Sequence, residues 1–118
     1  MVITSMVLKP FWTLINLMVT AQSNSMEILL EGRHSDRQIK INGKILSPEI
    51  SLKYRNHSPD GFAWGYGGSG PAQLALAILI ETVGAEKALD HYQDFKLQVI
   101  ANLPQSDFKK NIQIDIDN

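Results

Sequence analysis

The sequence predicts an α+β domain in which a small antiparallel sheet, made of a hairpin and the C-terminal strand, packs on two helices. Three observations lead to this class. Alternating apolar and polar residues flank Asn42-Gly43, an almost wholly apolar run follows Pro71, and the chain ends on alternating Ile and polar residues. The first and third patterns are typical of half-buried strands, and the second is typical of a buried helix.

The first strands are expected between Glu27 and Leu46, as a meander of two or three. Asn42-Gly43 suits a type I′ turn, because both central residues of that turn need a positive φ. Pro48 lacks the N–H that a sheet ladder uses, so pairing in that direction should end there.

The segment from Ser51 to Gly70, SLKYRNHSPDGFAWGYGGSG, predicts an ordered loop. Its Ser58-Pro59-Asp60-Gly61 stretch suits a type I turn. The composition of this segment argues against disorder, because disordered segments are poor in aromatic residues. Four aromatic side chains can hold the loop against the core: Tyr54, Phe62, Trp64 and Tyr66.

Two helices should follow the loop. Pro71 fits the first helical position, with Gly70 or Ser69 as the cap and Gln73 reaching back to the cap N–H. The run PAQLALAILIETVG is apolar on nearly every side, which predicts a buried central helix that is too short to span a bilayer. Gly84 should end it, and a second helix should continue to Pro104.

Length, charge and cysteine content narrow the class of protein. The 118 residues fit one domain, and the net charge of -1 offers no electrostatic attraction to nucleic acid or to an anionic membrane. The chain has no Cys, which excludes disulfides and thiolate chemistry and fits a cytoplasmic protein.

Residues 1–25 differ from the rest of the chain. They carry one Lys, no acidic residue and a short apolar stretch around Phe11 to Val19. We interpret them as an N-terminal extension outside a single domain of residues 26–118. A partner-binding arm and a weak secretion signal with a small residue at Ala21 are the alternatives.

A candidate ligand site lies where the loop meets the central helix. Residues 65–70 match G-x-G-x-x-G, but they follow an aromatic loop where a dinucleotide site needs a buried strand. Backbone N–H groups at this helix start could still hold an anion, and the alternative is that the glycines only let the loop fold. The expected ligand-binding residues are Arg55, Asn56, His57, Ser58, Trp64, Tyr66, Gly67, Gly68, Ser69 and Gly70.

Catalytic and metal sites have weaker support. His57 could act as an acid or base with Asp60 and a nearby serine, but no spacing in the loop demands a triad. We expect His57 and Asn56 to hydrogen bond to loop backbone instead. His34 and His91 fall on other elements, so no metal and no cofactor is expected.

The stretch RNHSPDGFAWGYGGSGPAQLALAIL, followed by YQDFKLQVIANLP, resembles DUF6166, a family of small bacterial and phage proteins. The resemblance covers about Glu27 to the tail and leaves out residues 1–25. It implies a single cytoplasmic domain, and it carries no established activity to this chain.

These observations favour a non-enzymatic binding module over an enzyme. Its loop would hold a small anionic ligand or a protein partner, with Arg55 supplying charge and Trp64 and Tyr66 supplying contact area. The alternatives are a small hydrolase or transferase that uses His57, and a structural or inhibitory subunit of a phage or host complex.

Overall fold

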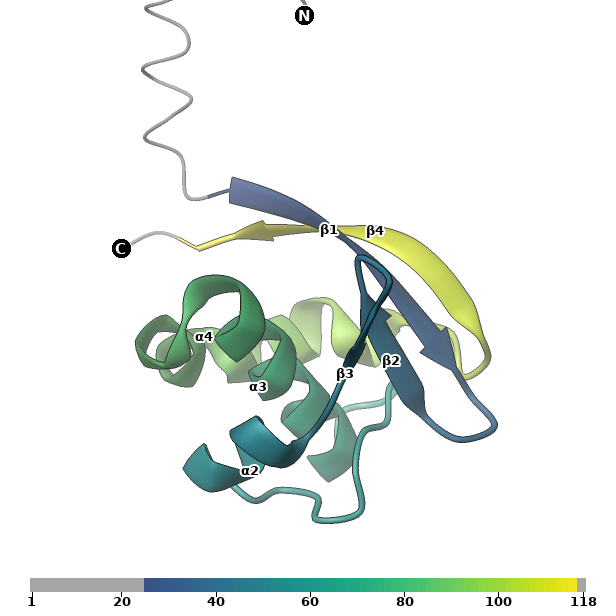
Figure 1. Cartoon of the computed structure of the whole chain (residues 1–118), viewed down its shortest axis with the longest axis horizontal. Coiled ribbons are helices and arrows are strands. Elements are labelled where there is room, and N and C mark those ends of the chain that lie inside the picture. Colours follow the sequence, from purple (N-terminus) through teal and green to yellow (C-terminus); the bar gives the residue numbers. More distant parts are fainter. Residues whose placement is uncertain (1–24, 117–118) are drawn as a thin grey trace, which may run out of the picture.

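The structure, a computed structural model, describes residues 25–116 and has the predicted α+β class. Figure 1 shows one sheet with the helices gathered on a single side of it. The strands are β1 Ser25–Arg33, β2 Gln38–Ile41, β3 Lys44–Leu46 and β4 Phe108–Asp115. The helices are α2 Glu49–Tyr54, α3 Ser69–Val83, α4 Ala85–Gln98 and the 3₁₀ turn η1 Ile100–Asn102.

The sheet is antiparallel throughout, in the order β3-β2-β1-β4. The C-terminal strand joins the hairpin strands as predicted, by pairing with β1 from Ser25↔Asp115 to Gly32↔Phe108. Strand β4 begins at Phe108, before the alternating Ile residues. The Phe108 ring packs over its partner Gly32, where any side chain would collide with it. Hairpin and tail therefore share one hydrophobic face.

The predicted turn at Asn42-Gly43 is confirmed. Asn42 has a φ of 51° and Gly43 a φ of 84°, the positive values that a type I′ turn requires. Asn42 also anchors the turn to β1, because its Oδ1 accepts a hydrogen bond from the Leu29 N–H at 2.9 Å. The Asn42 N–H donates to the Leu29 carbonyl at 2.9 Å.

The central helix α3 is buried as expected, from Gly70 to Leu79. It begins earlier than predicted, with Gly68 as its cap and Pro71 at the third helical position rather than the first. The cap predicted at Gly70 or Ser69 was therefore wrong. Proline is tolerated anywhere in a first turn, because the first four N–H groups of a helix have no acceptor inside it.

Two further boundaries differ from the prediction. Residues 49–54 form the short helix α2, where we expected a loop from Ser51 onward. The helix starts where the Ser47 Oγ accepts a hydrogen bond from the Glu49 N–H at 3.2 Å. The last helix ends at Gln98, and η1 fills the gap that we had assigned to the same helix as far as Pro104. The sheet thus packs on three helices.

The core lies between the sheet and α3. Ile28, Leu30 and Ile39 of the sheet are buried against the apolar side chains of α3. Only two of the four loop aromatics join this core, because Phe62 and Trp64 are buried whereas Tyr54 and Tyr66 are exposed. No helix among residues 25–116 is both long and apolar enough to cross a bilayer.

Candidate functional site

Gln73 of α3 fastens the start of the predicted ligand loop to the core. Its side chain is fully buried, and its Oε1 accepts hydrogen bonds from the backbone N–H of His57 at 2.8 Å and of Ser58 at 3.1 Å. Its Nε2 donates to the Ser51 Oγ at 2.8 Å and to the Arg55 carbonyl at 3.1 Å. Gln73 does not reach back to a helix cap as predicted, because the earlier helix start moves it out of the first turn. The side-chain amide instead pairs with a backbone segment that would otherwise leave buried polar groups unpaired.

His57 points toward α4 rather than along its own loop. Its Nε2 lies 2.8 Å from the hydroxyl of Tyr92, which is buried on α4. The expectation that His57 hydrogen bonds to loop backbone was therefore wrong: its N–H bonds the Gln73 side chain, and its ring packs against that of Tyr92. Within the described residues no hydrogen bond joins His57 to Asp60, Ser58 or Ser69.

The structure separates the remaining predicted loop residues into two groups. Trp64 is 3% exposed, donates its Nε1–H to the Ser106 carbonyl at 3.1 Å and packs edge-on against Phe108. Arg55 and Tyr66 are exposed, and Arg55 donates to the Tyr54 carbonyl at 2.7 Å. In residues 25–116, the N–H groups of Gly67 to Gly70 have no hydrogen-bond partner. The loop therefore offers accessible unpaired amides at Gly67, Gly68 and Ser69, while Gly70 is buried and the indole of Trp64 belongs to the core.

A second feature, which the sequence did not indicate, is a hollow between β3 and the C-terminal half of α3. We call it the hairpin groove, and its volume is about 440 Å³. Five apolar residues with little or partial exposure form its floor: Ile28, Ile41, Leu46, Ala77 and Ile80. Met26, Ile45 and Ile50 stand at its edge and are 40%, 65% and 53% exposed.

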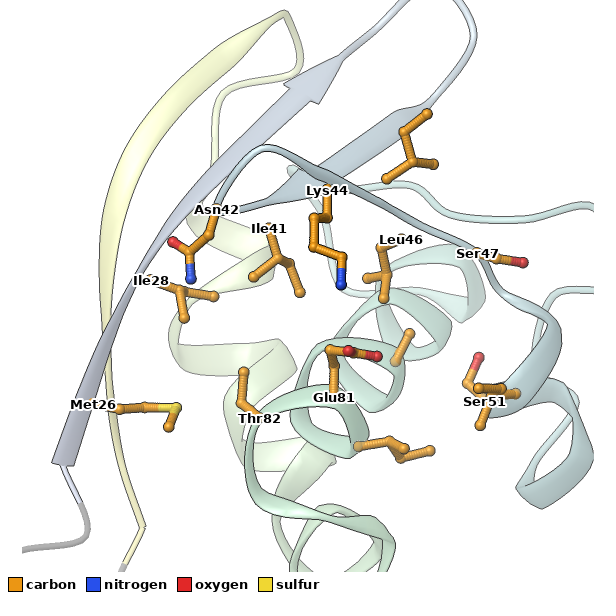
Figure 2. A pocket seen from close by; sticks show the side chains of 14 residues that line it. Met26, Ile28, Ile41, Asn42, Lys44, Leu46, Ser47, Ser51, Glu81 and Thr82 are labelled. Atoms are coloured by element: carbon orange, nitrogen blue, oxygen red, sulfur yellow. The ribbon is translucent and has the colours of Figure 1, made fainter.

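Two opposite charges stand at the mouth of the hairpin groove. Lys44 lies opposite Ile41 in the β2–β3 pairing, so its side chain belongs to the face of the sheet that looks toward the helices. Figure 2 shows Lys44 pointing into the groove from β3, with Glu81 on the opposite wall formed by α3. Lys44 and Glu81 form no ion pair with each other. The ion pair found among the described residues joins Arg33 to Asp36, which do not line the groove.

The two sites meet on one face of α3. Gln73, Ala77 and Glu81 follow one another at intervals of four, and Ile80 lies three residues after Ala77, so they share that face. Ser51 of α2 touches both parts, since it bonds Gln73 and also lines the hairpin groove. None of the ten residues predicted to bind a ligand lines this groove or the smaller hollow beside α4.

Sequence reasoning gave Gln73 the wrong role and missed the groove residues, for different reasons. A lone glutamine in the otherwise apolar stretch PAQLALAIL was a usable signal, because a buried side-chain amide needs hydrogen-bond partners. Lys44 and Glu81 carried no such signal, since an exposed charge in a hairpin or a helix is ordinary.

The elements and sites define a small α+β domain with one closed polar contact and one open apolar groove. The model of a family of unknown function, DUF6166, matches residues 31–117, and the chain belongs to that family. No curated protein and no solved structure matches it.

Proposed function

We propose that this domain is a non-enzymatic binding module whose hairpin groove takes an apolar segment of a protein partner. One observation carries the proposal: Met26, Ile45 and Ile50 are exposed around a single hollow with an aliphatic floor. Scattered exposed apolar residues are ordinary, but a contiguous group around a hollow is typical of an interaction site.

The size of the groove fits an occupant of a few side chains. Ligand sites commonly enclose about 300 to 1,000 Å³, and the groove encloses about 440 Å³. Burying an aliphatic side chain there would remove water from Ile45 and Ile50 as well as from the incoming group, which favours association.

The rim supports a peptide as the occupant. The Asn42 N–H faces β1, where it bonds the Leu29 carbonyl, so the backbone groups of the preceding Ile41 face β3 and its partner Lys44. Because the direction alternates along β3, the N–H and C=O of Ile45 face the open edge of the sheet. An extended segment can bond there while its side chains enter the groove, which is how strand addition combines affinity with specificity. Lys44 and Glu81 offer one charge of each sign, which suits a segment that carries both.

This proposal is compatible with the role of a structural or inhibitory subunit, because such a subunit also needs a surface for another protein. The absence of Cys fits a reducing compartment, and the proposal places the module in the cytoplasm.

The anion site in the loop from Arg55 to Gly70 stays a prediction alongside the groove. The unpaired N–H groups of Gly67, Gly68 and Ser69, which are exposed or half-buried, favour it. Titration of the protein with inorganic phosphate tests it directly, with saturable heat that is lost in Arg55→Ala as the expected result.

The groove is tested by selecting peptides from a random library displayed on phage against the full chain. A selected peptide is then measured by fluorescence anisotropy with wild type and two variants. Ile50→Asp places a charge at the groove, and we expect at least tenfold weaker binding. Leu97→Asp is the matched control, because Leu97 is 59% exposed on α4 and lies beside Gly67.

The two variants separate the two surfaces. Loss with Ile50→Asp and no change with Leu97→Asp supports the groove. Loss with Leu97→Asp alone moves binding to the loop side, and equal affinity for all three proteins contradicts the proposal.

A further inference from the structure

The strand β4 has one edge that no described strand pairs with. It spans Phe108–Asp115 and lies at the end of the sheet order, with β1 on its inner side. The other edge strand, β3, has only three residues. Long open edges are usually shortened, covered or charged, because their N–H and C=O groups can pair with another chain. A β4 of eight residues is therefore the larger open edge of this sheet.

The direction of the β4 backbone groups follows from the hairpin. Leu29 directs both its N–H and its C=O to Asn42, on the β2 side of β1. Because these groups alternate along a strand, the even-numbered residues of β1 face β4. Leu30 is paired with Lys110 and Ile28 with Ile112, so the odd-numbered residues of β4 direct their N–H and C=O to the open edge.

We propose that a second copy of this chain pairs with β4 in antiparallel orientation, about a two-fold axis at Ile112. In this register Lys109 lies opposite Asp115 of the second copy, and Asn111 lies opposite its Gln113. Both are pairs of odd-numbered residues, so both can exchange backbone hydrogen bonds across the axis. The two sheets join into one of eight strands, since each copy contributes the four of its sheet.

Charge favours this register over the symmetric ones with the axis at Asn111 or at Lys110. The Lys109 and Asp115 pair occurs twice because of the symmetry, and opposite charges directly across two strands stabilise their pairing. A two-fold axis at Asn111 instead places Asp115 opposite Asp107 of the second copy, and an axis at Lys110 places two lysines face to face. Like charges in those positions destabilise pairing.

The same register gives Lys110 an acidic neighbour. Lys110 lies opposite Leu30, so it belongs to the face of the sheet that carries the core, yet it is exposed. In the dimer it lies beside Ile114 of the second copy, which lines a hollow of about 380 Å³ between β4 and α4. Asp94 and His91 of α4 line that hollow too, so the ammonium group of Lys110 enters it next to a carboxylate.

Sedimentation velocity of the full chain over a range of concentrations tests the dimer. We expect a monomer–dimer equilibrium that Asp115→Lys weakens by tenfold or more, because two pairs of lysines then face each other. The double variant K109D/D115K restores opposite charges across the axis and should recover association relative to Asp115→Lys, although residue 109 then lies opposite Glu31 of its own β1 with the same charge. Glu27→Lys is the matched control, since it makes the same change of charge on exposed β1, away from the edge.

A monomer at every concentration overturns the dimer. A dimer that Asp115→Lys and Glu27→Lys affect equally, or that K109D/D115K does not recover, overturns the register. Lys110→Ala separates two roles of that lysine: weaker association supports its place in the hollow of the second copy. Stronger association shows that Lys110 opposes edge pairing and contradicts the proposal.

Discussion

The two halves of one face of α3 differ in how they contact the rest of the domain. At the N-terminal half, Gln73 is fully buried, and all four of its hydrogen bonds go to α2 and to the residues that follow it. At the C-terminal half, Ala77 and Ile80 face the hairpin groove, and the apolar residues around it stay exposed. The polar loop predicted to bind a ligand is therefore bonded to the core at its start, and the aliphatic stretch of α3 leaves a surface open.

This contrast has a physical basis. A buried polar group is stable only when each of its donors and acceptors is paired, so the Gln73 contact is specific and closed. Apolar side chains need no hydrogen-bond partner, so they can stay exposed to water at a moderate cost in free energy until a partner binds.

Replacing Gln73 by Leu should have the largest effect on stability. The change leaves the N–H groups of His57 and Ser58 and the carbonyl of Arg55 without their partner. We expect the free energy of unfolding to fall by about 3 kcal/mol, because each buried group left unpaired costs about 1 to 3 kcal/mol and the loop can partly rehydrate. Urea unfolding followed by circular dichroism measures it.

Gln93→Leu is the control for that substitution. Gln93 is exposed on α4, so its replacement should change the free energy of unfolding by less than about 0.5 kcal/mol. Equal losses in the two variants would mean that the Gln73 contacts do not hold the loop.

Ser51→Ala should have an intermediate effect, because Ser51 joins the two halves. Its hydroxyl accepts from Gln73 and donates to the Pro48 carbonyl at 2.8 Å, and the residue is 1% exposed. We expect a loss of about 1 kcal/mol, the typical net worth of a hydrogen bond in a folded protein. In the Gln73→Leu background the same change should lower the free energy of unfolding by less. Full additivity in a double-mutant cycle would mean that the two residues contribute independently and would contradict their coupling.

Lys44→Met should leave the stability almost unchanged, within about 0.5 kcal/mol, because Lys44 is exposed and has no ion pair among the described residues. Its side chain nevertheless points into the hairpin groove. Affinity for a selected peptide should therefore change where the unfolding curve does not. A loss of stability like that of Ser51→Ala would show that the open half is held as tightly as the closed half.

The smallest effect lies outside both halves, in the turn between β1 and β2. The Arg33 guanidinium, hydrogen bonded to both oxygens of Asp36, lowers the pKa of that carboxyl from 3.8 to about 2. A lowered folded pKa contributes stability above pH 3.8 that is lost as the pH falls toward 2. Asp36→Asn should thus be slightly less stable than wild type near neutral pH, and the difference should shrink as the pH falls toward 2 and vanish below it. Thermal melts of both proteins across that range measure it, and a difference that persists in acid would assign it to another cause.

Local signals predicted the parts of the fold that depend on local physics. Asn42-Gly43 predicted its turn because few residues accept a positive φ, and the apolar run after Pro71 predicted the buried helix. The helix α2 was missed because six residues are too few for a periodic pattern. Ser47-Pro48-Glu49, with a serine before a proline and an acidic residue, was the local signal that could have indicated its start.

The candidate site was harder to predict because it depends on tertiary contacts. The loop from Arg55 to Gly70 has the composition of a ligand site, and only the position of Gln73 reveals that two of its N–H groups are already paired. The hairpin groove is lined by residues of five elements, β1, β2, β3, α2 and α3, and a local sequence pattern does not show that these elements meet.

Hydrogen exchange at three amides tests the contrast between the two halves most directly. The account predicts that the N–H groups of His57 and Ser58 exchange slowly in wild type and rapidly in Gln73→Leu. It predicts that the N–H of Ile45, at the open edge of the sheet, exchanges rapidly in both proteins and slows when a selected peptide binds. Rapid exchange at His57 and Ser58 in wild type, or a protected Ile45 in the free protein, would contradict it.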